Sequence, residues 1–123
     1  MPKRIIIADD YNSLRNLLQI HYQESIEDSL VDAVSNGKEL VEKVKNENYD
    51  IVITDYDMGL MEMNGIEATR KIREFNTKIP IIIYSGKAEE IEEEALKSGA
   101  NECIDKREKQ DTIDDKIKGY LNL

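Results

Sequence analysis

Carboxylates stand at two points where a short apolar stretch of the chain ends. Residues 51–54 lead into Asp55, and residues 4–8 lead into Asp9 and Asp10. Both stretches are rich in β-branched residues, which is typical of buried strands. Carboxylates at such positions can bind a divalent cation, and one of them can attack phosphorus as a nucleophile. This chemistry requires a fold that brings the three carboxylates together.

Two further polar groups follow later apolar stretches. Ser85 comes directly after residues 81–84, and Lys106 follows the short stretch 101–104. A hydroxyl can donate a hydrogen bond to a phosphoryl oxygen, and an ammonium group can neutralise charge on the same group. Together with a carboxylate nucleophile, these are the groups that phosphoryl transfer needs.

Strand and helix patterns alternate five times along the chain. The predicted strands cover residues 4–8, 30–34, 51–54, 81–84 and 101–104. The predicted helices cover residues 13–24 with Asn12 or Ser13 as the cap, a stretch opened by Asn36-Gly37, and residues 65–75, 88–97 and 112–121. Such alternation forms a parallel sheet with helices on both faces, because each parallel crossover needs a helix. The carboxyl ends of the strands meet at one edge, so the polar groups that follow them are expected to converge.

Convergence of three carboxylates has an electrostatic cost. A pair of like charges about 4 Å apart costs roughly 4 kcal/mol at an effective dielectric constant of about 20. A divalent cation removes this penalty, and an all-oxygen site suits Mg²⁺ or Mn²⁺. The sequence therefore predicts Mg²⁺ as the cofactor, with Mn²⁺ as a substitute.

The composition excludes several classes of function. The chain has 123 residues, 40% of them hydrophobic and 35% charged, with a net charge of -9. This charge argues against binding of nucleic acid, which needs clustered cations, and no apolar stretch is long enough to insert into a bilayer. The single cysteine, Cys103, cannot form an internal disulfide, which agrees with a reducing cytoplasm. We expect one cytoplasmic domain over residues 1–123.

The four strand-end motifs together resemble the receiver domain of two-component response regulators, the CheY-like family, over the whole chain. They read Ile-Ile-Ala-Asp9-Asp10, Ile-Thr-Asp55, Ile-Ile-Tyr-Ser85-Gly86 and Ser98-Gly99-Ala100-Asn-Glu-Cys-Ile-Asp-Lys106. The resemblance implies an α/β fold of three layers, a (βα)5 doubly wound parallel sheet of the flavodoxin/CheY-like type with strand order 2-1-3-4-5. It also implies a single receiver domain, with no output domain in this chain.

The resemblance implies a signalling phosphoacceptor rather than an enzyme. Asp55 would accept a phosphoryl group from a histidine kinase, a phosphotransfer protein or a small acyl phosphate. The Mg²⁺ ligands would be Asp9, Asp10, Asp55 and the backbone carbonyl of Asp57. The protein is expected to be a monomer while it is unphosphorylated.

Further roles implied by the resemblance concern switching and the lifetime of the phosphate. Ser85 would be the switch hydroxyl, and Lys106 would contact the phosphoryl group. Asp57 and Lys87 would modulate the lifetime through access of the hydrolytic water. The output surface would consist of the fourth helix, the fifth strand and the fifth helix. Because residues 88–97 carry five glutamates, this surface favours a downstream protein with basic residues.

Three features depart from the family's usual pattern. The loop that begins at Met58-Gly59 lacks the usual proline and is two residues longer. Arg107 follows Lys106, where the family usually has a proline after this lysine. Cys103 stands where the family has an aromatic switch residue, and Tyr84 is the candidate to replace it.

Two other functions fit parts of the pattern. The departures are compatible with a pseudo-receiver that binds partners without phosphorylation. Residues 54–57 also resemble the Asp-x-Asp motif of haloacid-dehalogenase-type phosphatases, which use Mg²⁺, a hydroxyl and a lysine. In those enzymes the motif lies near the N-terminus and an acidic pair follows the lysine, whereas here Asp9-Asp10 precedes the motif.

Overall fold

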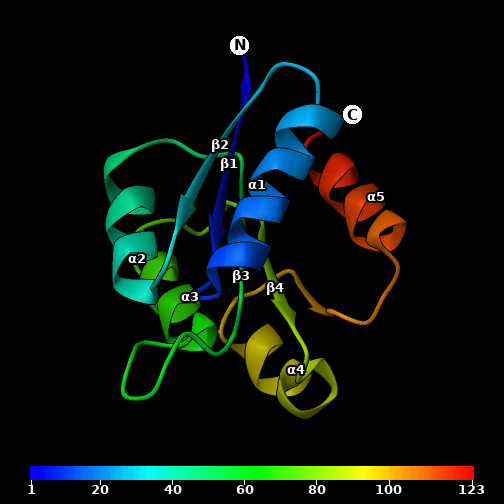
Figure 1. Cartoon of the computed structure of the whole chain (residues 1–123). Coiled ribbons are helices and arrows are strands. Elements are labelled where there is room, and N and C mark those ends of the chain that lie inside the picture. Colours follow the sequence, from blue (N-terminus) through cyan, green and yellow to red (C-terminus); the bar gives the residue numbers. More distant parts are fainter.

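Five parallel strands alternate with five helices in the computed structural model, which describes all 123 residues (Figure 1). The strands are β1 (Lys3–Ala8), β2 (Ser29–Val34), β3 (Ile51–Thr54), β4 (Ile81–Ser85) and β5 (Glu102–Asp105). The helices are α1 (Asn12–Ser25), α2 (Gly37–Asn46), α3 (Gly65–Arg73), α4 (Ala88–Lys97) and α5 (Gln110–Tyr120). The sheet has the order β2-β1-β3-β4-β5, and every pairing is parallel, which confirms the predicted topology.

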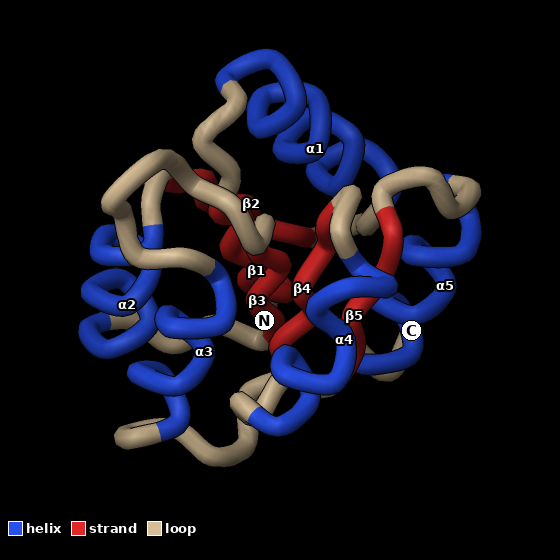
Figure 2. The backbone as a smooth tube through the Cα atoms, turned by 90° about the horizontal axis from the view of Figure 1, so that it is seen from below, coloured by secondary structure: helices blue, strands red, loops and turns tan.

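An apolar core covers each face of the sheet. Successive residues of a strand point to opposite faces, so Ile5 and Ile7 of β1 pack with α1 and α5, whereas Ile6 packs with α2, α3 and α4. Figure 2 shows the resulting layers, with the strands between the two groups of helices. Every residue of β3 and β4 is buried, as a parallel sheet covered on both faces requires. The polar chemistry is therefore confined to the ends of the strands.

Side-chain caps fix the starts of two helices. Asn36 accepts a hydrogen bond from the amide of Glu39 at the start of α2. Asn64 and Glu67 form a reciprocal capping box at the start of α3. Such a cap contributes about 1 kcal/mol to helix stability. The capping box also determines where the loop after β3 ends.

The predicted cap of α1 is wrong. Tyr11 occupies the cap position, and Asn12 already lies in the first turn. The carboxylate of Asp9 accepts a hydrogen bond from the Tyr11 amide at 2.9 Å, and the side chain of Asn12 instead accepts one from Arg15. The start of α1 is thus set by a carboxylate of the strand end that precedes it.

The other predicted bounds agree with the structure to within two residues. The fifth strand begins one residue later than predicted, because the side chain of Asn101 accepts hydrogen bonds from the Ile81 amide and from Arg73. The last helix begins two residues earlier, at Gln110, whose side-chain amide donates to the Tyr22 hydroxyl. Both differences come from contacts between distant parts of the chain.

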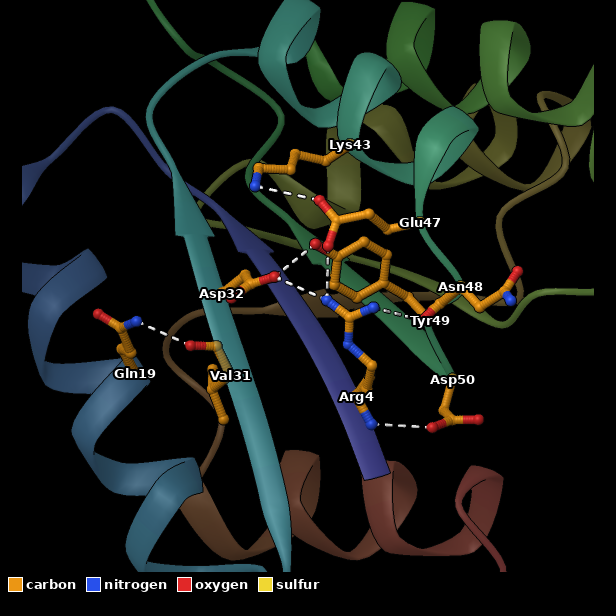
Figure 3. Close-up of polar contacts among 9 residues, drawn as sticks. All are labelled: Arg4, Gln19, Val31, Asp32, Lys43, Glu47, Asn48, Tyr49 and Asp50. Atoms are coloured by element: carbon orange, nitrogen blue, oxygen red, sulfur yellow. Dashed lines mark hydrogen bonds and ion pairs between the residues drawn. The ribbon is translucent and has the colours of Figure 1, made fainter. Parts of the chain in front are cut away.

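A polar cluster connects β1, β2 and the residues before β3 (Figure 3). The Arg4 guanidinium lies 3.2 Å from the Asp32 carboxylate and 2.8 Å from that of Glu47. It also lies 4.5 Å from the centre of the Tyr49 ring, and the Tyr49 hydroxyl donates to Asp32. The Arg4 amide donates to the Asp50 carboxylate at 2.8 Å. These contacts fix the start of β1 against its two neighbouring strands.

Tyr49→Phe removes one hydrogen bond of this cluster and keeps the ring in the core. We expect the free energy of unfolding to fall by about 1 kcal/mol, because Asp32 loses a partly buried donor. Urea unfolding followed by circular dichroism measures the change. Tyr11→Phe is the control, since the Tyr11 side chain is 66% exposed; an equal loss in both variants would contradict the role of Tyr49.

Candidate functional site

The carboxylates that follow β1 and β3 meet at one edge of the sheet. One oxygen from each of Asp9, Asp10 and Asp55 lies within 4.8 Å of the others. Lys106, which follows β5, places its ammonium nitrogen 3.1 Å from Asp9 and 3.1 Å from Asp55. This edge is the lower end of the sheet in Figure 1, toward which the strand arrows point. Four of the predicted site residues therefore form one cluster.

Burial and charge act against each other in this cluster. Asp9 is buried and the Asp55 side chain is 11% exposed, whereas Asp10 is exposed to solvent. Burial raises the pKa of Asp55, as does the charge of Asp9, although Lys106 acts in the opposite direction. Burial lowers the pKa of Lys106, but the neighbouring carboxylates outweigh it and the pKa is raised. Lys106 is therefore held in its charged form.

The residues fit a small divalent cation. Three carboxylates against one ammonium group leave two negative charges in a partly buried cluster. A divalent cation would balance this excess, and the donors are all oxygens, which Mg²⁺ prefers. Asp9, Asp10 and Asp55 are the side chains that could hold it.

The start of α3 holds the backbone of Asp55 in place. The Gly65 amide donates to the Tyr56 carbonyl at 2.7 Å, and a Cβ atom at Gly65 would lie 2.2 Å from the carbonyl oxygen of Asp55. The Thr54 hydroxyl donates to the same Asp55 oxygen at 2.9 Å. The sequence identified Gly65 only as a loop and helix-start residue, because a close approach between two backbone segments leaves no periodic signal.

Ser85 and the two predicted modulators lie at the ends of β3 and β4. Ser85 is 2% exposed, and its hydroxyl oxygen accepts a hydrogen bond from the Lys87 amide at 3.0 Å. The Lys87 ammonium lies 3.7 Å from the Asp57 carboxylate, and both side chains are more than half exposed. The two side chains thus form an ion pair, and its exposure means that it contributes little to stability.

Cys103 and Tyr84 lie on opposite faces of the sheet. Cys103 packs against the core formed with α2, α3 and α4, where its thiol lies 3.9 Å from the Ala88 carbonyl. Burial raises the pKa of this thiol to about 11. Tyr84 packs in the core formed with α1 and α5, and its ring centre lies 6.0 Å from the Lys106 ammonium. Tyr84 thus contacts the lysine of the cluster and does not fill the space beside Cys103.

The site matches a known family. A model of the response regulator receiver domain matches residues 5–118. The chain belongs to the response regulator receiver family. Receiver domains of this family are signalling domains, and this membership confirms the resemblance inferred from the four motifs.

Proteins similar to this chain come from several organisms. The chain is 34% identical to the chemotaxis protein CheY of Halobacterium salinarum over 98% of both chains. It is 38% identical to part of the sensor protein EvgS of Escherichia coli, covering 81% of this chain and 8% of EvgS. It is 36% identical to part of the transcriptional regulatory protein SrrA of Staphylococcus aureus, covering 85% of this chain and 42% of SrrA. Receiver domains similar to this chain thus occur alone and within longer proteins.

Solved structures share the fold of this receiver domain. The response regulator TrrA of Thermotoga maritima, solved in complex with Mg²⁺-BeF, superposes with a TM-score of 0.84 at 30% identity and covers 96% of this chain and 98% of its own. A CheY-like receiver domain from Methanospirillum hungatei gives a TM-score of 0.85 at 27% identity, covering 99% and 95%. None of the helices combines the length and the apolar composition of a membrane span.

Gly65→Ala tests the close approach between α3 and Asp55. The added methyl group would displace the backbone of Asp55, so we expect a loss of about 1–3 kcal/mol in the free energy of unfolding. Gly119→Ala in α5 is the matched control: its Cβ would meet no atom within 4 Å, and removal of a helical glycine stabilises by up to about 1 kcal/mol. Chemical denaturation of both variants measures the contrast. Equal effects would contradict the steric role of Gly65.

Asp55→Asn tests the electrostatic cost of the cluster. With Mg²⁺ removed by EDTA at pH 7, we expect the variant to be more stable than the wild type, because the raised pKa means that folding disfavours ionised Asp55. As the pH falls toward 3.8, the ordinary pKa of Asp, Asp55 becomes protonated and the difference should narrow. Thermal unfolding at several pH values measures both trends. A variant that is less stable at pH 7 would show that pairing with Lys106 outweighs burial.

Proposed function

We propose that this receiver domain accepts a phosphoryl group on Asp55 in a Mg²⁺-dependent reaction and thereby controls a partner protein. The cluster of three carboxylates bridged by Lys106 is the observation that carries this proposal. It combines a nucleophile, a cation site and a fixed positive charge at one edge of the sheet. The complex of TrrA with Mg²⁺-BeF supports the same use of the site in a relative.

The residues of the cluster would bind the cation, attack phosphorus and stabilise negative charge in the proposed reaction. Asp9, Asp10 and Asp55 would hold Mg²⁺ together with the backbone carbonyl of Asp57. The bound cation supplies charge neutralisation on the phosphoryl oxygens. A carboxylate oxygen of Asp55 would attack phosphorus while the bond from phosphorus to the donor breaks, so that a phosphohistidine nitrogen or the carboxylate of an acyl phosphate leaves with the electron pair. The Lys106 ammonium would stabilise the negative charge on the transferred group.

Ser85 connects phosphorylation to α4. Its hydroxyl now accepts from the Lys87 amide, and α4 begins one residue later, at Ala88. Donation from this hydroxyl to a phosphoryl oxygen would draw the start of α4 toward the site. Reversing a 1:99 equilibrium takes about 5.5 kcal/mol of differential binding. One charge-assisted hydrogen bond gives about 1.5–3 kcal/mol, so several contacts must change together.

The proposed output surface is the face made by α4, β5 and α5. It contains a groove of about 560 Å³ between the two helices. Its lining includes more acidic than basic side chains: Glu89, Glu92, Glu102, Asp105 and Glu108 against Arg107 and Lys116. A partner that presents basic residues would complement this groove. Residues that shift in an NMR spectrum on phosphorylation should include this face.

The phosphodonor would be a histidine kinase, a phosphotransfer protein or a small acyl phosphate. We further propose that residues 1–123 act as one domain, in the cytoplasm, and as a monomer before phosphorylation. Size-exclusion chromatography with light scattering, with and without acetyl phosphate, measures the oligomeric state. A dimer before phosphorylation would contradict it.

Phosphorylation can be tested with a small donor. After incubation with acetyl phosphate and Mg²⁺, the intact mass should show one phosphate adduct per chain. The adduct should be absent when EDTA replaces Mg²⁺ and absent in Asp55→Asn, because each removes a required part of the site. Dilution of the donor then gives the lifetime of the adduct, which Lys87→Ala should change without abolishing its formation.

Other outcomes would identify the competing functions. No adduct on the folded wild type would favour a pseudo-receiver. An adduct retained in Asp55→Asn would point to another acceptor, with Asp57 the next candidate. Hydrolysis of a general phosphate ester over many turnovers would favour a phosphatase of the haloacid-dehalogenase type.

A further inference from the structure

Several hydrogen bonds hold the turn that follows β5, on both sides of Lys106. The Lys106 amide donates to the Ser85 carbonyl at 3.1 Å, which continues the pairing of β4 with β5. The Glu108 amide donates to the Asp105 carbonyl at 3.0 Å and closes a β-turn over residues 105–108. Lys106 therefore belongs both to the end of the strand and to the turn.

One carboxylate connects the residues on either side of this lysine. Asp105 accepts hydrogen bonds from the Arg107 backbone amide at 2.8 Å and from its Nε at 2.9 Å, and the Nη2 group of Arg107 contacts its second oxygen. The Asp105 side chain is only 16% exposed. The Arg107 contacts lower the pKa of Asp105 to about 2. The carboxylate is thus charged and fully engaged at neutral pH.

From this geometry we propose that the Asp105–Arg107 pair is a positioning device for Lys106 in the phosphorylation reaction. The proposal rests on the proposed function of Asp55 and adds two residues to it. Neither residue contacts the carboxylate cluster; both act through the lysine between them.

The pair would act by fixing the direction of the backbone at Lys106, and therefore the direction of the Lys106 side chain. The Lys106 side chain must reach across the sheet edge to lie 3.1 Å from both Asp9 and Asp55. All peptide bonds are trans, and no proline restricts the turn. Without the Asp105 side-chain contacts, the backbone around Lys106 would keep two hydrogen bonds, from the Lys106 amide to the Ser85 carbonyl and from the Glu108 amide to the Asp105 carbonyl, and neither involves the peptide between Lys106 and Arg107. Small errors in placing a reacting group reduce rates strongly.

The test compares rates of phosphorylation by acetyl phosphate. We expect Asp105→Ala to slow the reaction by about tenfold to a hundredfold. Arg107→Ala should slow it less, because the backbone amide still reaches Asp105. The Mg²⁺ dissociation constant from calorimetry should not rise, since none of the cation ligands is altered. Asp50→Ala is the matched control. Asp50 precedes β3, and its carboxylate accepts a hydrogen bond from the Arg4 amide, at a distance from Lys106. This variant should keep the wild-type rate.

A double-mutant cycle separates positioning from a general structural effect. In a Lys106→Ala background, followed over a longer incubation, Asp105→Ala should produce no further loss. An equal loss with and without Lys106, or a weakened affinity for Mg²⁺, would overturn the proposal. Wild-type rates of phosphorylation in both Asp105→Ala and Arg107→Ala would also overturn the proposal. A wild type that forms no adduct would instead reject the proposed function itself, so the two failures are distinguishable.

Discussion

The ion pairs from Lys106 to Asp9 and Asp55 are the constraint on which the site depends. They join the carboxyl ends of β1, β3 and β5, which are far apart in sequence. Parallel pairing of the strands makes this possible, because it brings every strand end with a functional group to the same edge. The sheet holds the strand ends in fixed positions, and the residues that follow them carry the carboxylates and the ammonium group. A fold with antiparallel strands would have placed the same residues at opposite edges.

The two cores serve different parts of the site. The core with α1 and α5 contains Tyr84 beneath the Lys106 ammonium, and the core with α2, α3 and α4 contains Cys103 beside α4. Ser85 lies at the end of the strand between them. In the proposed switch, Ser85 would be coupled to α4 through the backbone of residues 85–88.

Local patterns in the sequence were sufficient for the strands, the helices and the convergence of the clustered residues, whereas the strand order came from the resemblance to the receiver family. The strand at 51–54 and the helix at 88–97 were predicted with the observed bounds, because apolar runs and helical spacing are local signals. The predicted cap of α1 was wrong because Asp9, at the preceding strand end, accepts the hydrogen bond from the Tyr11 amide. Pairs such as His21 with Asp114, which connect α1 and α5, depend on tertiary structure. The contact of Gly65 with the Asp55 carbonyl also requires coordinates.

Asp57 and Lys87 differ from the rest of the site in one respect: their side chains are 62% and 54% exposed, whereas Asp9 is buried. Substitutions at these two positions leave the core packing and the carboxylate cluster intact. Under the proposed role of this pair in the lifetime of the phosphate, substitutions there would change the duration of a signal without a cost in fold stability. The same property makes the pair a convenient place to engineer timers, in which one receiver scaffold would carry slow and fast variants that differ at two surface residues.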